Sequence, residues 1–464
     1  MTDVALTAAE IAAVTGGRVV SGAAGQRIER WSIDSRSVAP GEMFVAIRGE
    51  RFDGHDFAAD ALDRGAAGVV VENGRTARTD RLVIEVGDTT RALQDVARDV
   101  RRRSGAQVVA ITGSAGKTTT KELTADFLSA RFSVFRNKGN LNNHIGLPLS
   151  LLELRSRPEV AVVELGMNHA GEIRTLVGIA EPEVRVWTNV GDAHLGFFES
   201  ADRIADAKAE ILEAARPTDR LIANADDRRI MSRSGGFAGR TVTFGLSEGA
   251  IVRASGVEHR GLDGMTARIS TPAGTVDVST PLLGTGNLLN LLAATAVAGE
   301  YGIPLEAIAE RAAQLQPSAH RGELLRLPGG VTLIDDSYNS SPSALLRALE
   351  TVKASAGSAR KVAVLGEMLE LGAHTDRLHE QCGRAAAEAG LDLLIAVGGE
   401  PAARLASAAR DAGMAESAIS YAGTSGEAAE IALRRVRPGD LVLVKGSRGI
   451  RTDLVVDRLK VEFA

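Results

Sequence analysis

Residues 111–122, ITGSAGKTTTKE, decide the fold of the chain around them. A β-rich apolar run, Val108–Ile111, leads into the turn Gly113–Gly116, after which Lys117 and Thr118 open a helix-like stretch. Glycines let the backbone approach an anion, and the N–H groups of such a turn and helix N-terminus face it. Lys117 would add charge at the outer phosphates, and the Thr118 hydroxyl can bind Mg²⁺. Position 111 is Ile where the general pattern has Gly, so an ordinary strand–turn–helix junction remains the alternative.

Composition is that of an ordinary globular protein. The 464 residues predict two to four domains, and 44% of them are hydrophobic and 24% charged. A net charge of −5 gives no electrostatic reason to expect nucleic acid or an anionic membrane as a partner. The single cysteine, Cys382, cannot form an internal disulfide, which favours a cytoplasmic location.

No targeting or membrane segment is predicted. The N-terminal sequence has no basic segment followed by an apolar core, so it does not indicate a signal peptide. No apolar run reaches the roughly 18 residues that a membrane span needs.

Three successive α/β units are predicted, with boundaries at 1–104, 105–317 and 318–464. Strand-like runs alternate with helical stretches in the second and third units, which predicts mainly parallel sheets flanked by helices. Residues 250–283 are expected to add antiparallel hairpins to the second sheet. The expected strands are Ala66–Val71, Leu82–Val86, Val108–Ile111, Val160–Leu165, Val184–Val190, Arg220–Ala225, Thr241–Phe244, Val331–Ile334, Lys361–Leu365, Leu391–Val397 and Leu441–Val444.

Two helices in the first unit carry end signals. Thr7 and Glu10 have the spacing of a capping box, and Gly16 ends the helix that they open. The helix predicted for Thr89–Arg103 ends in three arginines. We interpret Arg101–Arg103 as cations that oppose the helix dipole rather than as a ligand-binding patch.

Candidate metal ligands follow the strands of the second unit, because functional residues gather at the carboxyl ends of strands in open α/β sheets. Glu164 follows two valines, where an unpaired carboxylate would be costly to bury. A metal ion beside Thr118 would remove that cost. His194 follows the next strand; alone it could be an exposed histidine, but with Glu164 and Thr118 it becomes a candidate Mg²⁺ ligand. Lys208 lies on a predicted helix, where spacing alone suggests a solvated lysine.

Two polar segments are further candidates for ligand contact. Residues 137–152, NKGNLNNHIGLPLSLL, form an amide-rich loop before an apolar helix, and ordinary turn chemistry explains such a loop equally well. Residues 335–342, DDSYNSSP, follow a strand of the third unit. Their carboxylates, phenol and amide suit a ligand surface, although a helix cap and turn would use similar residues.

Together these segments resemble the Mur ligase family, ATP-dependent enzymes that form amide bonds in bacterial cell-wall precursor synthesis. The resemblance covers nearly the whole chain. DSRSVAPGEMFVAIRG (34–49) and RFDGHDF (51–57) are similar to the family's uridine-nucleotide domain, and GSAGKTTTKE, LGEMLELG (365–372) and KGSRG (445–449) also match. DDSYNSSP is similar to the segment of the member type that joins D-alanyl-D-alanine to UDP-N-acetylmuramoyl-tripeptide. The Asp-Asn-Pro-Arg segment of many ligases that act one step earlier is not in the sequence.

The resemblance implies three domains: a small α/β uridine-nucleotide domain, a central P-loop ATPase-like domain and a C-terminal Rossmann-like α/β domain. The ATP-binding residues would be Gly113, Ser114, Ala115, Gly116, Lys117, Thr118, Thr119, Asn287, Arg321 and Asp336. The ligands of Mg²⁺, with two ions expected, would be Thr118, Glu164, His194 and, if carbamylated, Lys208. The catalytic residues would be Lys117, Glu164, His194 and Lys208. The UDP-precursor would contact Ser35, Asp53 and His55, and the dipeptide would contact Tyr338 and Asn339.

The implied reaction phosphorylates the terminal carboxylate of the tripeptide with ATP, and the amine of D-alanyl-D-alanine then attacks the acyl phosphate. We expect a monomer with no nucleic-acid partner. Gly286 stands where the family usually has His, and His144 stands where an acidic residue is expected. The alternatives are the preceding ligase, which adds a diamino acid, and a nucleotide-dependent switch or binding module without ligation.

Overall fold

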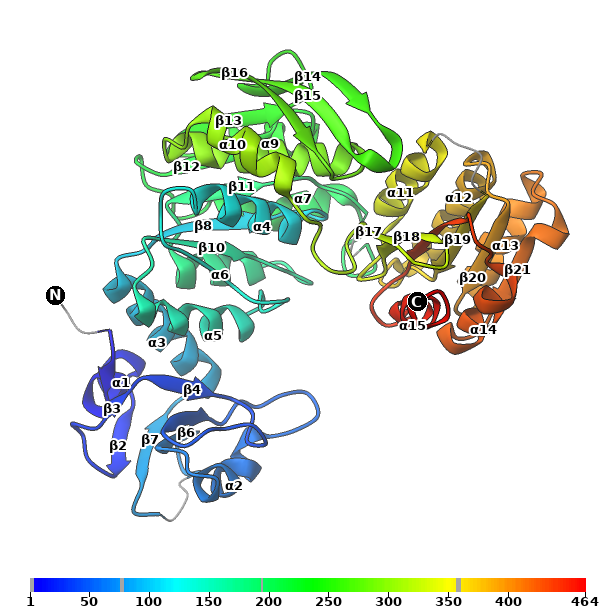
Figure 1. Ribbon diagram of the computed structural model, residues 1–464. Helices are drawn as coiled ribbons and strands as arrows, with labels where there is room; N and C mark the ends of the chain where they lie inside the picture. The colour runs from blue at the N-terminus through cyan, green and yellow to red at the C-terminus, as the bar shows by residue number, and fades with distance from the viewer. Residues whose placement is uncertain (1–3, 76–78, 193–194, 356–359) are drawn as a thin grey trace.

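Figure 1 shows the computed structural model, which describes residues 4–75, 79–192, 195–355 and 360–464. The chain forms three successive α/β units, each built on its own main sheet. The α/β fold class expected from the sequence is therefore confirmed. Among the described helices, none combines the length and the hydropathy that a membrane crossing requires.

The first unit holds a five-stranded sheet in the order β2-β7-β6-β5-β4 and a separate β1-β3 pair. Within the five-stranded sheet, β2 is antiparallel to β7 and the other pairs are parallel. The helices and strands are β1 (Leu6–Thr7), α1 (Ala8–Thr15), β2 (Arg18–Ser21), β3 (Arg27–Ile28), β4 (Arg30–Ser32), β5 (Glu42–Val45), α2 (Ala58–Asp63), β6 (Gly68–Glu72), β7 (Leu82–Val86) and α3 (Thr89–Ser104).

The predicted boundaries of α1 are confirmed. The Thr7 hydroxyl accepts a hydrogen bond from the Glu10 N–H, and the Glu10 carboxylate accepts one from the Thr7 N–H, which completes the capping box. Gly16 ends the helix in the left-handed conformation, with φ of 64°.

The second unit contains a nine-stranded sheet in the order β16-β15-β14-β13-β12-β11-β8-β10-β9. Its helices and strands are β8 (Gln107–Thr112), α4 (Lys117–Leu128), β9 (Val134–Arg136), α5 (Gly146–Leu152), β10 (Val160–Glu164), α6 (Glu172–Ala180), β11 (Val184–Trp187), α7 (Ala201–Ala209), β12 (Arg220–Asn224), α8 (Arg228–Ser234), β13 (Arg240–Gly245), β14 (Val252–His259), β15 (Met265–Thr271), β16 (Gly274–Thr280), α9 (Gly284–Glu300) and α10 (Leu305–Gln314).

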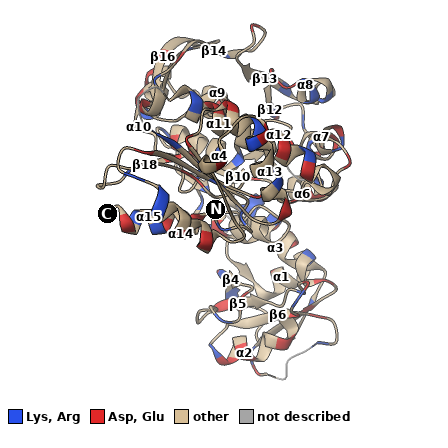
Figure 2. Ribbon diagram, turned by 90° about the vertical axis from the view of Figure 1, so that its right-hand side faces the viewer, with Lys and Arg blue, Asp and Glu red and all other residues tan. Residues whose placement is uncertain are grey.

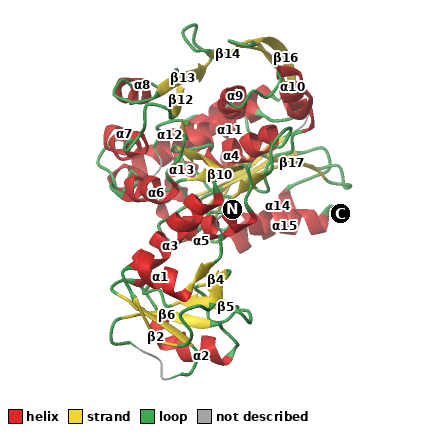
Figure 3. Cartoon of the chain, turned by 90° about the vertical axis from the view of Figure 1, so that its left-hand side faces the viewer, coloured by secondary structure: helices red, strands yellow, loops and turns green. Residues whose placement is uncertain are grey.

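This central sheet is parallel from β14 to β9, and β15 and β16 extend it as the expected antiparallel hairpins. Helices cover both of its faces (Figure 3). Side chains alternate along β8, so Val109 and Ile111 pack with α4 and α9, whereas Val108 and Ala110 pack with α5 and α6. The strand ends between these layers are therefore fixed by two hydrophobic cores.

The third unit has a six-stranded sheet in the order β17-β18-β22-β19-β20-β21, in which only the β17–β18 pair is antiparallel. Its helices and strands are β17 (Glu323–Arg326), β18 (Thr332–Asp336), α11 (Pro342–Ala354), β19 (Lys361–Gly366), α12 (Thr375–Glu388), β20 (Leu393–Val397), α13 (Glu400–Asp411), β21 (Ile419–Ala422), α14 (Ser425–Arg435), β22 (Leu441–Lys445) and α15 (Asp453–Glu462). Basic and acidic residues are interspersed along outer helices such as α15 (Figure 2).

Cys382 lies on α12 and is fully buried. Burial raises the pKa of its thiol to about 12. This confirms the sequence-based expectation of a free thiol, and it leaves almost no thiolate at neutral pH.

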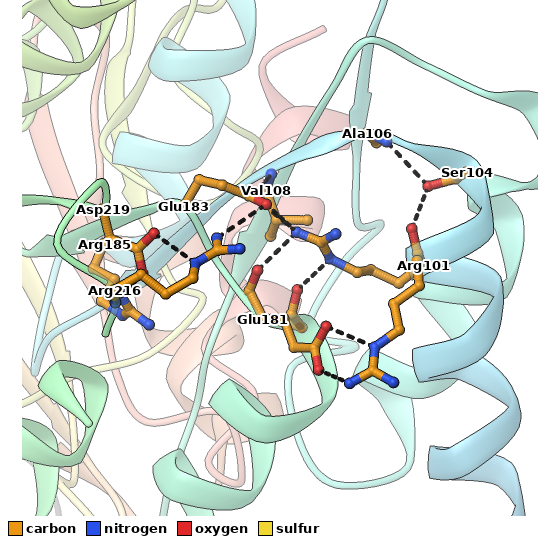
Figure 4. A network of polar contacts seen from close by, with 11 residues as sticks. Arg101, Ser104, Ala106, Val108, Glu181, Glu183, Arg185, Arg216 and Asp219 are labelled. Carbon is orange, nitrogen blue, oxygen red and sulfur yellow. Dashed lines mark hydrogen bonds and ion pairs between the residues drawn. The ribbon is translucent and has the colours of Figure 1, made fainter. Parts of the chain in front are cut away.

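The first two units are joined through α3, which packs against α5 and α6. Figure 4 shows the polar contacts at this joint. The Arg101 guanidinium donates to the carbonyl oxygens of Ala180 and Glu181 and to the Glu183 carboxylate, at 2.6–2.8 Å. Glu183 also accepts from the Val108 N–H at 2.7 Å. Arg101 therefore ties the end of α3 to the start of the central sheet, and its partners are structural groups rather than an open ligand patch.

A second ion pair lies deeper in the same network. The Arg185 guanidinium donates to the Asp219 carboxylate at 2.8 Å, and the two side chains are 2% and 1% exposed. Arg216 donates to the other Asp219 oxygen at 3.1 Å (Figure 4). These contacts join β11 to the segment that precedes β12.

Candidate active site

The phosphate-loop segment has the predicted form, a turn between β8 and α4. Ile111 lies inside β8 and is fully buried, so the turn begins at Gly113 and is shorter than the general pattern. Gly116 has φ of 78°, and a Cβ at this position would lie 2.2 Å from Asn290 Oδ1 on α9. Only glycine fits there.

Asn189, two residues after the end of β11, fixes the middle of this turn. Its Oδ1 accepts from the Ala115 N–H and its Nδ2 donates to the Ala115 carbonyl, both at 2.9 Å. The Thr188 hydroxyl donates to the same carbonyl at 2.9 Å. Contacts with the segment that follows β11 therefore hold the middle of the turn in place.

Lys117 begins α4, and its ammonium group donates to the Gly113 carbonyl at 2.9 Å. Burial lowers the pKa of Lys117; the Glu164 carboxylate opposes that effect and the charge of Arg321 adds to it. A bound phosphate group would neutralise the positive charges of both Lys117 and Arg321.

Glu164 and Thr118 meet as the sequence predicted. The Thr118 hydroxyl donates to Glu164 Oε2 at 2.6 Å, and Asn142 Nδ2 donates to Oε1 at 2.7 Å. Glu164 is 4% exposed, and its N–H donates to Asn137 Oδ1 at 3.1 Å. The amide-rich loop before α5 thus holds Glu164 in position in addition to forming its own turn.

This donor set suits Mg²⁺. Carboxylate and hydroxyl oxygens are the ligands that Mg²⁺ prefers, and its sites commonly use one or two carboxylates together with substrate phosphates. The described residues contain no cluster of three or more His, Cys, Asp or Glu side chains that could hold a metal on its own. Glu164 and Thr118 would therefore bind the ion together with the phosphates.

Lys208 is buried on α7, with 1% of its surface exposed, so the solvated position suggested by spacing alone is wrong. Among the described residues, none forms a hydrogen bond or ion pair with its ammonium group. Burial lowers the pKa of Lys208 well below its usual range; Lys117 adds to this effect and Glu164 opposes it. His194, the other predicted ligand, lies outside the described residues.

The third unit presents its predicted residues to the same cavity. This cavity has a volume of about 810 Å³, and Lys117, Thr118, Glu164, Asn287, Arg321, Asp336, Tyr338 and Asn339 line it. The carboxyl ends of the central strands and of β18 therefore face one space.

The predicted dipeptide residues are oriented by cations. The Arg321 guanidinium lies 3.9 Å from the centre of the Tyr338 ring, and Arg448 lies 5.4 Å from it. Lys445 Nζ donates to Asp336 Oδ2 at 2.6 Å and to the Asn339 carbonyl at 3.0 Å. Lys445 thus fixes two predicted ligand residues at once.

Asp335 and Asp336 have different environments. Asp335 is fully buried and accepts from the Ser337 hydroxyl at 2.6 Å, with His320 Nδ1 at 2.8 Å. Asp336 ends β18 and lines the cavity. Asp335 therefore serves the turn before α11, whereas Asp336 is available to a ligand.

The predicted UDP residues are not among those that line this cavity, although Glu50 of the same unit does line it. His55 donates through Nδ1 to Asp53 Oδ1 at 2.5 Å and accepts at Nε2 from the Glu72 N–H at 2.9 Å. The hydrogen bonds from His55 hold the pKa of Asp53 below its usual range. Asp53 also accepts from Arg75 at 2.7 Å. Asp53 and His55 thus have structural partners, and their contact with a nucleotide, like that of Ser35, stays a prediction.

Sequence reasoning missed three residues that shape the site. Asn290 lies one helical turn after Asn287 and accepts from Thr120 at 3.2 Å, so the i, i+3 spacing on α9 is the signal that could have found it. Lys445 lies 109 residues from its partner Asp336, within a segment noted only for its family likeness. Arg347, on α11, has no sequence signal.

Family models match three successive parts of the chain. Residues 27–101 match "Mur ligase family, catalytic domain", residues 111–298 match "Mur ligase middle domain", and residues 320–448 match "Mur ligase, glutamate ligase domain".

The curated relatives of this chain share one name. The UDP-N-acetylmuramoyl-tripeptide–D-alanyl-D-alanine ligase of Bacillus subtilis is 31% identical over 427 residues, 92% of each chain. That of Escherichia coli is 38% identical over 368 residues, 79% of this chain and 80% of the relative.

Solved structures agree over almost the full length. MurF from Acinetobacter baumannii has a TM-score of 0.89 at 32% identity, covering 98% of this chain and 99% of that one. MurF ligase from Thermotoga maritima in complex with ADP has a TM-score of 0.83 at 31% identity, covering 94% and 98%.

Proposed function

The chain belongs to the Mur ligase family, and from that premise we propose that it joins D-alanyl-D-alanine to UDP-N-acetylmuramoyl-tripeptide with ATP. The product is the pentapeptide precursor of peptidoglycan, and ADP and phosphate are released. The observation that carries this proposal is one cavity in which the Lys117–Thr118–Glu164 cluster faces the DDSYNSSP segment.

The three units would have different roles in substrate binding. Residues 1–104 would bind the uridine precursor, residues 105–317 would bind ATP, and residues 318–464 would contribute to both ATP and dipeptide binding. This division is supported by the three separate main sheets and by the residues that line the cavity.

Two anions, a carboxylate and a triphosphate, must meet in the first step, so positive charge is the main requirement. Lys117 would leave the Gly113 carbonyl and bind the outer phosphates, while Arg321 neutralises charge from the other side of the cavity. Mg²⁺, when bound through Thr118 and Glu164, supplies further charge at the phosphates.

The tripeptide carboxylate oxygen then bonds to the γ-phosphorus and ADP leaves. In the second step the dipeptide nitrogen attacks the acyl carbon, phosphate leaves, and the nitrogen gives up a proton to form the amide. Tyr338 and Asn339 would orient the dipeptide, and closure of the third unit over the second would keep water from the acyl phosphate.

Lys208 would act as a carbamate. A buried amine without a charged partner favours its neutral form, and a neutral amine can add CO₂ and release a proton to give an anionic oxygen ligand. With Glu164 and His194 it would help to hold a second Mg²⁺. Lys208→Ala should then lose activity, and added short carboxylic acids should restore part of it; an active Lys208→Ala enzyme would overturn this role.

A mass-spectrometric assay with UDP-N-acetylmuramoyl-tripeptide, ATP and D-alanyl-D-alanine tests the main proposal. The expected result is the pentapeptide together with ADP. Ligation only when the dipeptide precursor and a diamino acid are supplied would identify the preceding ligase instead. Nucleotide binding without ADP formation with any muramyl precursor would indicate a switch or binding module.

A further inference from the structure

Helix α11 of the third unit packs against the first turn of α9 in the second. Two glycines allow this approach. A Cβ at Gly284 would lie 2.9 Å from Thr351 Oγ1, and a Cβ at Gly286 would lie 3.3 Å from Arg347 Nε. The Arg347 side chain therefore occupies the space above Gly286, next to Asn287 in the same turn.

Arg347 carries a charge without a partner in the described part of the chain. None of the residues described there donates to, accepts from or forms an ion pair with its guanidinium group. The carboxylates of Glu350, Asp336 and Asp192 are near enough to raise the pKa of Arg347, but burial has the larger effect and lowers it. Arg347 is half-buried on the cavity wall, and because arginine keeps its proton, its guanidinium group is free to meet a ligand there.

The surroundings indicate what kind of ligand this is. Arg347 lines the same cavity as the phosphate loop; of the other lining residues, Ala348 follows it on α11, and Leu283 and Asn287 flank the turn of α9 that it covers. Apolar walls with one amide suit a planar base rather than a second phosphate. A guanidinium group is planar and stacks flat on aromatic rings, whereas a lysine ammonium is a compact point charge without a planar face.

We propose that Arg347 stacks on the purine base of ATP and holds it against the first turn of α9. The base then contacts both the second and the third unit, so nucleotide binding fastens α11 to α9. This inference rests on the proposed function, because it takes the cavity to be the ATP site.

The test measures binding of Mg-ADP and of inorganic tripolyphosphate to the full chain by calorimetry. Arg347→Lys keeps the charge and removes the planar face. It should weaken Mg-ADP binding about 2- to 10-fold, because the lysine ammonium keeps only part of the cation–π attraction, and leave tripolyphosphate binding unchanged. The KM for ATP should rise while kcat at saturating ATP stays near the parent value.

Other results would overturn the inference. If Arg347→Lys weakens the binding of Mg-ADP and of tripolyphosphate equally, Arg347 contacts the phosphates. If Mg-ADP binding is unchanged, Arg347 has a purely structural role. A parent chain that binds neither ligand would refute the proposed ATP site itself, which separates that failure from a failure of the Arg347 role.

A double-mutant cycle gives an independent readout. Gly286→Ala places a methyl group 3.3 Å from Arg347 Nε, so the guanidinium must shift by a few tenths of an ångström, which should weaken its stacking and Mg-ADP binding. In the Arg347→Ala background the same change should have little further effect, because its target is gone. Gly299→Ala, on the same helix, is the matched control, since nothing lies within 4 Å of the added methyl group. Additive losses from Gly286→Ala and Arg347→Ala would contradict the proposed contact.

Discussion

Two buried lysines in the central unit should respond differently to the same substitution. Lys208 and Lys121 are each 1% exposed. Lys121 donates to the Asn137 carbonyl at 2.6 Å and pairs with Glu122 at 3.1 Å, whereas Lys208 has no such partner among the described residues. Lys121→Met should lower the free energy of unfolding by about 1–3 kcal/mol, because it leaves a buried carbonyl without its donor. Lys208→Met should leave the free energy of unfolding unchanged or raise it.

The size of the Lys208 effect follows from the way the free energy of unfolding depends on pH. Burial lowers the folded-state pKa of Lys208, so between that pKa and the unfolded value of about 10.4 the unfolded chain binds one more proton. Stability therefore rises with pH in this window, by about 1.4 kcal/mol for each pH unit. For each pH unit inside this window, the parent chain should gain up to about 1.4 kcal/mol relative to Lys208→Met.

Urea unfolding at several pH values measures this difference. The buffers should be free of CO₂ and contain a chelator, so that neither carbamylation nor metal binding contributes. Lys117 is present in both chains, and its own titration is largely removed by the comparison. Parallel stability curves for the parent and Lys208→Met would refute the reasoning, because they would mean that Lys208 stays charged in the folded chain.

Three further outcomes are expected. Lys117→Ala should keep the fold, as judged by circular dichroism, and cut turnover by about 10²-fold or more, because one charge contact to the phosphates is lost; near-normal turnover would contradict its role. Glu164→Gln should weaken Mg²⁺ binding, since a neutral amide replaces the carboxylate. The Mg²⁺ concentration that gives half-maximal ADP release should therefore rise. Asp219→Ala should lower the free energy of unfolding by about 3–5 kcal/mol, because it leaves buried Arg185 without its carboxylate. Asp277→Ala, at an exposed ion pair, is its control and should leave the urea midpoint unchanged.

The sequence was sufficient to predict the contacts that follow from strand order. Glu164 and Thr118 both lie at carboxyl ends of the central sheet, and parallel strands bring such ends together. The capping box at Thr7 needed only local spacing. The short edge strands β9, β17 and β21 were missed because edge strands are half-exposed and lack a continuous apolar run.

Contacts between residues far apart in the sequence could not be predicted in this way. Lys445 reaches Asp336 across two neighbouring strands, and Arg347 reaches Gly286 across two units, with no spacing rule to connect them. Lys208 shows a related limit. Its position on a helix suggested solvent, and only the packing of α7 against the rest of the unit decides that it is buried.

The chemistry of Cys382 has a practical consequence. Its thiol is fully buried and almost entirely protonated at neutral pH, so maleimide reagents should leave it unmodified in the folded chain. Since it is the only cysteine, the native sequence already serves as a background for site-specific labelling. Dyes attached to cysteines introduced at exposed positions such as Arg51 and Glu416 would report the distance between the outer units in single molecules as substrates are added.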